Sequence, residues 1–544
     1  MSKSLKKEIL VLFLLFLLLF CSCNIIIDTG IESKDTAVEV VDSDGAYESD
    51  SKNHWLIDED GNRTSEESHM YYNSYEVDGS GKYIKECSVC HYKRIYEKIV
   101  NIPEYDKNKG MYSLTIYAPS IYDDEYDPSS VKTGSFKLNA SESLDYFNSS
   151  NSTSKSLDEN IFNELIEIKA SDKLYLKGNF QDNNPLTFWF DENISKTRFY
   201  INEKLKTESF VDTSYIGIGK LSPEKFYAEF KTALIAELKN NYLAEEESIF
   251  DIKAWDYDGD GFFRIVVIDF GEGTVNLSGA GISGTAGMYI TNNLSNNTSS
   301  NQSDMFFVNA RFIVPCYYKL NYSVEKCAQT FMTTLSHEYM HYLQDAYWVQ
   351  QYNTTIHGSS FLLEGLANTA AFYTLKDSNI INFSGQMSFM LNKSKAFYPY
   401  LETQNKTSVN LLDYSLGPLF FIYVKNNFGQ NFVNEFIKSG EGNIDKATRS
   451  ILKVPFTKVY IDCLREAFSQ ANNKTSDYYL FGLTKDIIDQ YFSYDGVGEV
   501  FTSSNNSYSA SNLYQLSFVI NKFDKKYNEI YLTGSGFKTF IFFL

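Results

Sequence analysis

The chain has 544 residues, 43% hydrophobic and 16% aromatic, which excludes a wholly disordered protein and allows about two to four domains. Its 69 acidic residues outnumber the 49 lysines and arginines, so the formal net charge is −20. A chain with this charge repels phosphate backbones, so we expect no nucleic acid among its partners. About half of the excess lies between residues 28 and 67, where 13 acidic residues accompany only 3 basic ones.

The N-terminus has the pattern of an export signal. Three lysines within the first seven residues precede an apolar run over residues 9–20, and Cys21, Ser22 and Cys23 follow it. This run is shorter than the ~20 apolar residues of a spanning helix and is typical of a secretory signal. A cysteine directly behind such a core resembles a bacterial lipoprotein processing site. We therefore expect a lipoprotein signal peptide over 1–23, lipidation at Cys23 and a membrane-anchored protein at the cell envelope or surface. The alternatives are processing at Cys21 and an ordinary cleaved signal.

Composition and periodicity divide the rest of the chain into four parts. Residues 24–98 predict an acidic linker with a small Cys/His module, whose first part, to about residue 67, is a flexible spacer. Residues 99–208 contain short alternating runs between turns, which predicts a β-rich domain. Residues 209–491 combine a buried strand with long helical patterns, and residues 492–544 return to alternation, which predicts a C-terminal β-rich unit.

One helical segment carries the sequence His337-Glu338-x-x-His341. Residues four apart lie on one face of a helix, so both imidazoles can bind one Zn²⁺ at about 2.0–2.1 Å. Glu338 lies beside them, where it can take a proton from the attacking water. The pattern therefore predicts a catalytic zinc site.

A catalytic zinc needs a third protein ligand and one open position. Glu364 is the candidate, because it lies 23 residues after His341, far enough for a second helix to begin. His357 is the competing ligand, although its spacing differs from that of zinc peptidases with a third histidine. Asp345 and Asn368 each follow a ligand by four residues, so they are candidates to accept hydrogen bonds from the ligand histidines. The alternative is that both are solvated polar residues.

These motifs resemble the glutamate-type zinc peptidases, and more closely the hyicolysin family of bacterial secreted neutral metalloproteinases. The resemblance rests on the histidine motif and on Phe361-Leu362-Leu363-Glu364-Gly365, and it covers about residues 221–440. Softer matches to that family occur at 256–261, 286–290 and 303–309. The chain departs from the family in Tyr339 and Met340 inside the motif and in Gly365-Leu366-Ala367 after the ligand.

The resemblance implies an α+β fold, in which a zincin-like metallopeptidase domain over 209–491, with a mixed sheet and a helical half, is flanked by β-rich domains. It implies the following roles: His337, His341 and Glu364 as zinc ligands, and Glu338 as the catalytic acid/base. The strand 305–309 is expected at the sheet edge above the active-site helix, where a peptide substrate would pair with it.

The expected reaction is hydrolysis of protein or peptide bonds. Zn²⁺ lowers the pKa of the attacking water, and Glu338 takes its proton and later delivers it to the leaving amine. A donor must stabilise the developing oxyanion, and relatives often use a Tyr or His on a downstream helix. Tyr414 is the candidate here, with a packing aromatic as the alternative. The rival function is a surface binding or adhesion lipoprotein on a catalytically degenerate peptidase scaffold.

A second metal site is predicted where alternate carboxylates precede a glycine, as in the first half of a calcium loop. The residues are Asp256, Asp258, Asp260 and Gly261. Position twelve of the loop is Val267 instead of a glutamate, so Asp251 or Asp269 would have to complete a Ca²⁺ site. The alternative is an Asp/Gly turn that leads into the following strand.

The Cys-x-x-Cys pair at Cys87 and Cys90 permits three interpretations. One is a structural Zn²⁺ site with His69 and His54 (or His91). The others are a disulfide and, because His91 follows directly, a c-type haem attachment site. The segment resembles small His…Cys-x-x-Cys modules of bacterial surface proteins, although their usual glycine after the second cysteine is His91 here. Three further cysteines are expected as buried thiols, with a Cys316–Cys327 bridge as the alternative: Cys316, Cys327 and Cys463.

Overall fold

A computed structural model of the chain describes part of the sequence. The described residues are 47–49, 53–57, 63–78, 81–96, 99, 102–103, 111–118, 133–141, 186–190, 197–202, 219–238, 240, 242–259, 261, 263–271, 273–278, 281–294, 301–354, 360–375, 413–472, 499–501, 507–514, 518–523, 529–535 and 537–543. The predicted signal peptide, Cys23, Asp260 and His357 lie outside them. Among the described helices, none combines the length and apolar character needed to cross a membrane. The fold is α+β, as expected.

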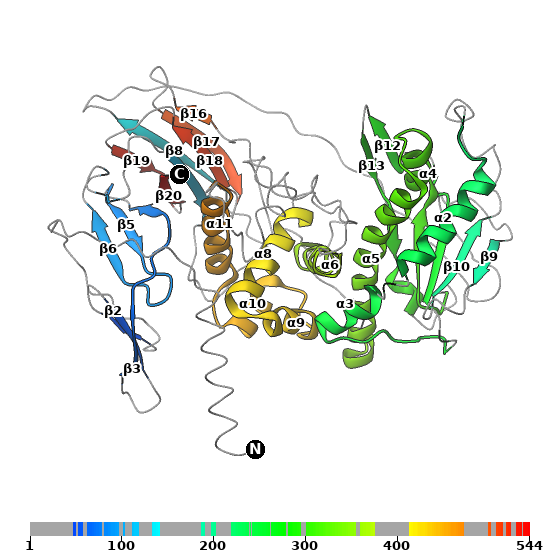
Figure 1. Cartoon of the computed structure of the whole chain (residues 1–544). Coiled ribbons are helices and arrows are strands. Elements are labelled where there is room, and N and C mark those ends of the chain that lie inside the picture. The colour runs from blue at the N-terminus through cyan, green and yellow to red at the C-terminus, as the bar shows by residue number, and fades with distance from the viewer. Residues whose placement is uncertain are drawn as a thin grey trace, which may run out of the picture.

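A five-stranded mixed sheet forms one side of the molecule, in the order β14-β15-β11-β10-β9 (Figure 1). Its strands are β9 (Leu186–Phe190), β10 (Thr197–Asn202), β11 (Phe263–Ile268), β14 (Gly287–Tyr289) and β15 (Met305–Asn309). The three inner strands are parallel, and β9 and β14 pair antiparallel at the two edges. A short hairpin of β12 (Val275–Ser278) and β13 (Gly281–Gly284) precedes β14.

The expectation that residues 305–309 form the sheet edge is wrong. All five residues of β15 are buried, and β14 pairs with its outer side. A strand that is apolar on both faces belongs inside a sheet, because an edge position would expose part of it. Among the described strands, β14 is the sheet edge nearest the helix that carries His337 and His341.

Helices cover one face of this sheet. They are α2 (Pro223–Leu238), α4 (Ala310–Tyr318) and α5 (Val324–Tyr352). Phe230 of α2 and Phe306 of β15 both contact Phe331 of α5, so the three elements share one aromatic core. Ser323 caps α5 by accepting a hydrogen bond from the Lys326 N–H, and the left-handed Asn353 ends the helix.

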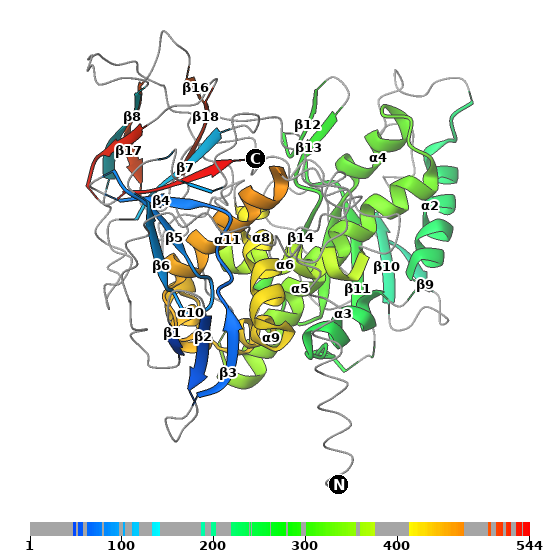
Figure 2. The same ribbon diagram turned by 60° about the vertical axis from the view of Figure 1, so that its left-hand side comes forward.

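The other side of α5 packs against a helical half (Figures 1 and 2). Its helices are α3 (Tyr242–Phe250), α6 (Ser360–Leu375), α8 (Asp413–Phe428), α9 (Gln430–Lys438), α10 (Ile444–Leu452) and α11 (Phe456–Asn472). The long helix α5 therefore lies between the sheet and the helical half. This central position explains why its motif residues are largely buried.

Distant parts of the chain combine in a β-rich unit beside α11 (Figure 1). A seven-stranded sheet has the order β16-β18-β7-β20-β4-β5-β6, and two three-stranded sheets have the orders β17-β8-β19 and β1-β2-β3. The strands are β1 (Tyr47–Ser49), β2 (Asn53–Ile57), β3 (Arg63–Ser68), β4 (Tyr75–Val77), β5 (Tyr83–Glu86), β6 (Lys93–Tyr96), β7 (Met111–Tyr117), β8 (Thr133–Ser141), β16 (Glu499–Phe501), β17 (Ser507–Tyr514), β18 (Phe518–Phe523), β19 (Glu529–Thr533) and β20 (Phe537–Phe543).

This pairing corrects the expected domain boundaries. Strands from the expected parts 24–98, 99–208 and 492–544 share one sheet, because β7 pairs with both β18 and β20 and β20 pairs with β4. The two strands β9 and β10, expected in the 99–208 domain, instead extend the five-stranded sheet from β11. Three strands also begin inside the segment expected to be a flexible spacer.

Candidate active site

The helices α5 and α6 bring the predicted zinc ligands together. His337 and His341 lie one turn apart on α5, with their Nε2 atoms 3.2 Å apart. Glu364, near the start of α6, places Oε2 3.0 Å from His337 Nε2 and 3.4 Å from His341 Nε2. These three atoms form one of the groups in the described structure that are close enough to hold a metal ion.

The geometry of this group fits zinc. Ligand atoms at 2.0–2.1 Å from a tetrahedral zinc ion lie about 3.3 Å from one another, and the three observed separations are 3.0, 3.2 and 3.4 Å. Glu364 Oε2 is buried and has no hydrogen-bond partner with good geometry among the described residues. Such an atom is costly to bury unless a cation compensates it.

The charges of the three side chains also suit a cation. Burial would raise the pKa of the Glu364 carboxyl, but the adjacent His341 and His337 outweigh it and hold the pKa well below its usual range. Burial would lower the pKa of His337, but Glu364 and Glu338 outweigh this effect and raise it. Glu364 is therefore a carboxylate at neutral pH, which is the form that binds metal ions.

Asn368 fixes the orientation of one ligand ring. His337 Nδ1 donates a hydrogen bond of 3.0 Å to the Asn368 side-chain oxygen, because that oxygen can only accept. A proton on Nδ1 leaves the Nε2 lone pair for a metal. Asn368 lies one turn after Glu364 on α6, so the same helix supplies a ligand and the partner of another.

Asp345 is bound to the edge strand. It is fully buried and accepts a hydrogen bond of 2.7 Å from the Tyr289 hydroxyl of β14. Burial raises the pKa of Tyr289 well above its usual value, and the Asp345 carboxylate acts in the same direction, so the phenol stays a donor. This contact fixes β14 on α5, a role that the sequence did not reveal.

Glu338 is held by the same strand. The backbone N–H of Tyr289 donates a hydrogen bond of 2.7 Å to Glu338 Oε2. The close approach requires a glycine, because a Cβ at Gly287 would lie 2.6 Å from Thr334 Cγ2 and 3.4 Å from Glu338 Cγ. The predicted general base is therefore positioned between its own helix and the sheet edge.

Helix α3 supports the motif from the opposite side. Ser336 donates a hydrogen bond to the fully buried Glu246, and the Tyr339 hydroxyl donates one of 2.6 Å to Glu247. Burial raises the pKa of Glu246 well above its usual value, despite the bond from Ser336. Tyr339 is one of the departures from the family pattern, and its contact with Glu247 gives it a structural role. Sequence reasoning missed both glutamates, because nothing local marks them as partners of α5.

A glycine contact joins α6 to α8 directly behind Glu364. A Cβ at Gly365 would lie 2.8 Å from Gly417 Cα, and a Cβ at Gly417 would lie 2.5 Å from Gly365 Cα. The backbones touch, so neither position can give way by rotating a side chain. Gly365 is one of the departures from the family pattern, and this contact gives it a structural role.

We expect Gly365→Ala to destabilise the protein by about 1–3 kcal/mol, because the added methyl group overpacks a backbone contact. On an exposed helical site the same change would stabilise by up to about 1 kcal/mol, so the sign isolates the steric effect. Thermal unfolding measures the stability, and zinc content shows whether Glu364 has moved. Unchanged or increased stability would show that the helices are not in contact at this position.

Tyr414 lies in the first turn of α8, three residues before Gly417, and its side chain is outside the described residues. The predicted oxyanion role therefore stays a prediction. His357, the competing third ligand, is also outside the described residues.

The structure groups the aspartates of the predicted calcium loop with a different partner from the one expected. Asp256 and Asp258 group with Asp304, which precedes β15. The two residues expected to complete the site have other partners, since Asp251 pairs with Lys438 at 2.5 Å and Asp269 pairs with Arg311.

Asp304 is the buried member of this group. Only 4% of it is exposed, and its Oδ1 has no hydrogen-bond partner in the described structure. Burial raises the pKa of Asp304 to about 7, and Asp258 and Asp256 act in the same direction. Arg264 pairs with Asp258, so its positive charge partly balances the three carboxylates. The calcium site stays a prediction, with Asp304 in place of Asp251 or Asp269.

The Cys/His module also converges. His54, His69, Cys87 and Cys90 form a third group of potential ligands, in which His91 has no part. Cys87 and Cys90 are unbridged, as are the three buried cysteines of the helical region, so neither proposed disulfide is present.

No protein-family model matches this chain, and no curated protein resembles it at a significant level.

Proposed function

We propose that the protein is a zinc-dependent endopeptidase of the hyicolysin type that acts outside the cytoplasm. The observation that carries this proposal is the convergence of His337, His341 and Glu364 at tetrahedral spacing, with Glu338 in the next position of the same helix. A site that only stored zinc would need no carboxylate at that position. Under this proposal the residues 209–491, together with β9 and β10, form a zincin-like unit.

When bound, zinc would polarise both the scissile carbonyl and the attacking water. Glu338 takes the proton from that water and delivers it to the leaving amine. The Tyr289 N–H fixes one oxygen of Glu338, which holds the carboxylate in a single orientation. The Asn368 hydrogen bond keeps His337 in the tautomer whose Nε2 faces the ligand group.

The edge strand β14 supplies the place for a peptide substrate. The Ala286 carbonyl accepts a hydrogen bond from the Asn309 N–H of β15, so the alternation of a strand directs the backbone groups of Gly287 and Tyr289 away from β15. The Tyr289 N–H already binds Glu338. A substrate that adds as a further strand would therefore bond to Gly287 and the Tyr289 carbonyl.

The proposal includes an envelope location. A lipid on Cys23 would tether the enzyme to a membrane and restrict it to protein or peptide substrates near that surface. This part rests on the sequence alone.

Metal removal tests the proposal. We expect a zinc chelator to reduce casein cleavage by the full-length protein at least about 100-fold, and one equivalent of zinc to restore it. The measurement is release of casein fragments, with metal content determined in parallel. Zinc retained at the Glu364 site without cleavage of any tested protein would contradict the peptidase and favour the binding scaffold.

A further inference from the structure

Four metal-ligating side chains meet far from the active site, at the junction between β2 and the turn after β5. Their ligand atoms all lie within 4.8 Å of one another. Cys90 Sγ lies 3.3 Å from His69 Nδ1. In a tetrahedral zinc site with two sulfur and two nitrogen ligands, the ligand atoms lie about 3.3–3.8 Å from one another. The distance from Cys90 to His69 falls within this range. Two thiols and two imidazoles form a donor set that favours zinc over calcium or magnesium.

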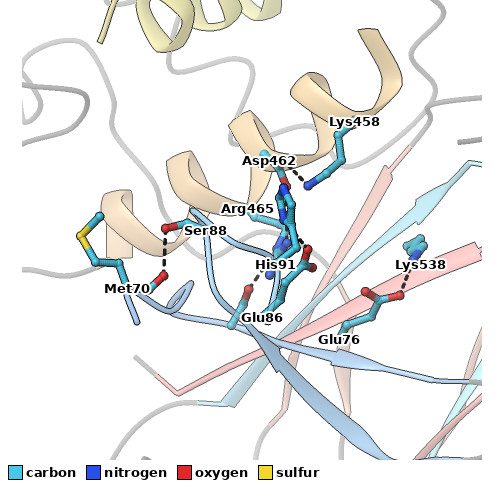
Figure 3. Close-up of polar contacts among 10 residues, drawn as sticks. Met70, Glu76, Glu86, Ser88, His91, Lys458, Asp462, Arg465 and Lys538 are labelled. Atoms are coloured by element: carbon cyan, nitrogen blue, oxygen red, sulfur yellow. Dashed lines mark hydrogen bonds and ion pairs between the residues drawn. The ribbon is translucent and has the colours of Figure 1, made fainter. Parts of the chain in front are cut away.

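The backbone is organised around the two cysteines. Cys87 forms an isolated bridge with Tyr71, and its carbonyl accepts a hydrogen bond of 3.2 Å from the His91 N–H across the Cys-x-x-Cys turn. The Ser88 N–H donates a hydrogen bond of 2.7 Å to the Met70 carbonyl. The Ser88 hydroxyl donates one of 2.9 Å to the same carbonyl (Figure 3), and both bonds bring the segment of His69 against the turn. Thus the ligands come from segments that the main chain already fixes.

His91 takes the backbone conformation that glycine usually supplies in such modules. Its φ of 58° is left-handed, which costs a non-glycine residue about 1–2 kcal/mol. Its ring turns to Glu86, with Nδ1 2.8 Å from Oε1, and not to the cysteines (Figure 3). The departure from the usual pattern therefore leaves the four-residue group intact.

The β1-β2-β3 sheet and the turn with the two cysteines have little apolar core of their own. The described side chains of β3 are all exposed, and the cluster around the cysteines contains only Cys87, Cys90 and Tyr92, with two partly buried neighbours. His54 in β2 is nevertheless only 2% exposed. Small units of this kind are commonly stabilised by a metal or by disulfides, and the cysteines here are unbridged.

We propose that His54, His69, Cys87 and Cys90 bind a second, structural zinc ion that fastens the β1-β2-β3 sheet to the rest of the β-rich unit. The site has no open position, because four protein ligands complete a tetrahedron. It therefore stabilises the fold and takes no part in catalysis.

The segment between β3 and β4 contacts the helical half through α11. Arg465 donates a hydrogen bond of 3.2 Å to Ser74, and its guanidinium lies 4.0 Å from the centre of the Tyr72 ring. Glu86 and His91, which flank the two cysteines in the sequence, lie beside Lys458 and Arg465 of α11 (Figure 3). The second zinc site thus lies beside an interface with the helices behind the active site.

Cobalt substitution of the full-length protein tests the proposal without any variant. A thiolate bound to Co²⁺ gives intense charge-transfer absorption in the near ultraviolet. The Glu364 group contains no sulfur, so this absorption reports the second site alone. We expect it in the wild-type protein and in Glu364→Ala, and we expect the native protein to hold two zinc ions per chain.

Cys90→Ser should lose most of the thiolate absorption and one of the two zinc ions, and proteolysis should become faster within residues 47–68. Cys316→Ser is the matched control, because a hydroxyl can replace the thiol that donates to the Phe312 carbonyl. This variant should keep the full thiolate absorption and both zinc ions. Cobalt bound to the wild type without thiolate absorption would overturn the proposal. A Cys87–Cys90 disulfide or covalent haem, seen by mass spectrometry of protein purified without reductant, would also overturn it. None of these readouts depends on peptidase activity.

Discussion

Glu338→Gln is expected to lower the rate of casein cleavage about 10²–10⁴-fold while zinc remains bound. Glutamine has nearly the same shape and still accepts the hydrogen bond from the Tyr289 N–H, but it cannot take a proton from the attacking water. Because Glu338 is not among the grouped ligand atoms, the metal content should not change. The loss should appear in kcat more than in KM, since the proton moves only as the reaction proceeds.

A matched control is available on the same helix. Glu325 lies in the first turn of α5 and is exposed, so Glu325→Gln makes the same chemical change away from the site. We expect its cleavage rate and zinc content to match those of the wild type. A Glu338→Gln protein that cleaves casein at the wild-type rate would refute the proposed general base.

Glu364→Ala is expected to abolish zinc binding at the active site. Loss of a residue that only orients a ligand weakens metal binding about 10–100-fold, and loss of a ligand itself should exceed that range. Removal of the carboxylate also leaves His337 and His341 with their nitrogens 3.2 Å apart and no anion between them. Cleavage should fall together with zinc content, which distinguishes this variant from Glu338→Gln.

Zinc titration followed by calorimetry or by metal analysis checks this result. The control is Glu435→Ala, an exposed glutamate in α9. The second zinc should remain in Glu364→Ala, and cobalt absorption from thiolates should be unchanged. Full active-site zinc in Glu364→Ala would show that another residue is the third ligand, with His357 as the first to test.

The structure gives a reason why several unrelated positions should influence this site. Tyr289 binds both Glu338 and Asp345, and Asn368 binds His337. Gly287 permits the close approach of β14, and Gly365 permits that of α8. Together these contacts attach β14, α6 and α8 to one another and to α5 around the ligands and the general base. Preorganised neighbours of this kind keep a metal site in its productive geometry.

The sequence by itself determined the local arrangement of the site. His337 and His341 share a helix face because they are four residues apart, and Asn368 lies one turn beyond Glu364 for the same reason. Periodicity also predicted which parts of the chain are helical and which are β-rich, since helical and alternating patterns depend only on neighbouring residues. The resemblance implied a strand at Met305–Asn309, which the structure has, but at the sheet edge, which the structure gives to β14.

Only the tertiary structure decided which segments become partners. Strand pairing places β7 beside β18 and β20, about 400 residues later in the chain, and no local pattern encodes such a partner. The same holds for β14 as the sheet edge, for Glu246 beneath Ser336 and for Asp304 beside Asp256. At the Cys/His module the sequence left His54 and His91 as rivals, and the fold brings His54 to the cysteines because β2 crosses there. Local spacing fixes which atoms share a face, whereas packing of distant elements decides what that face meets.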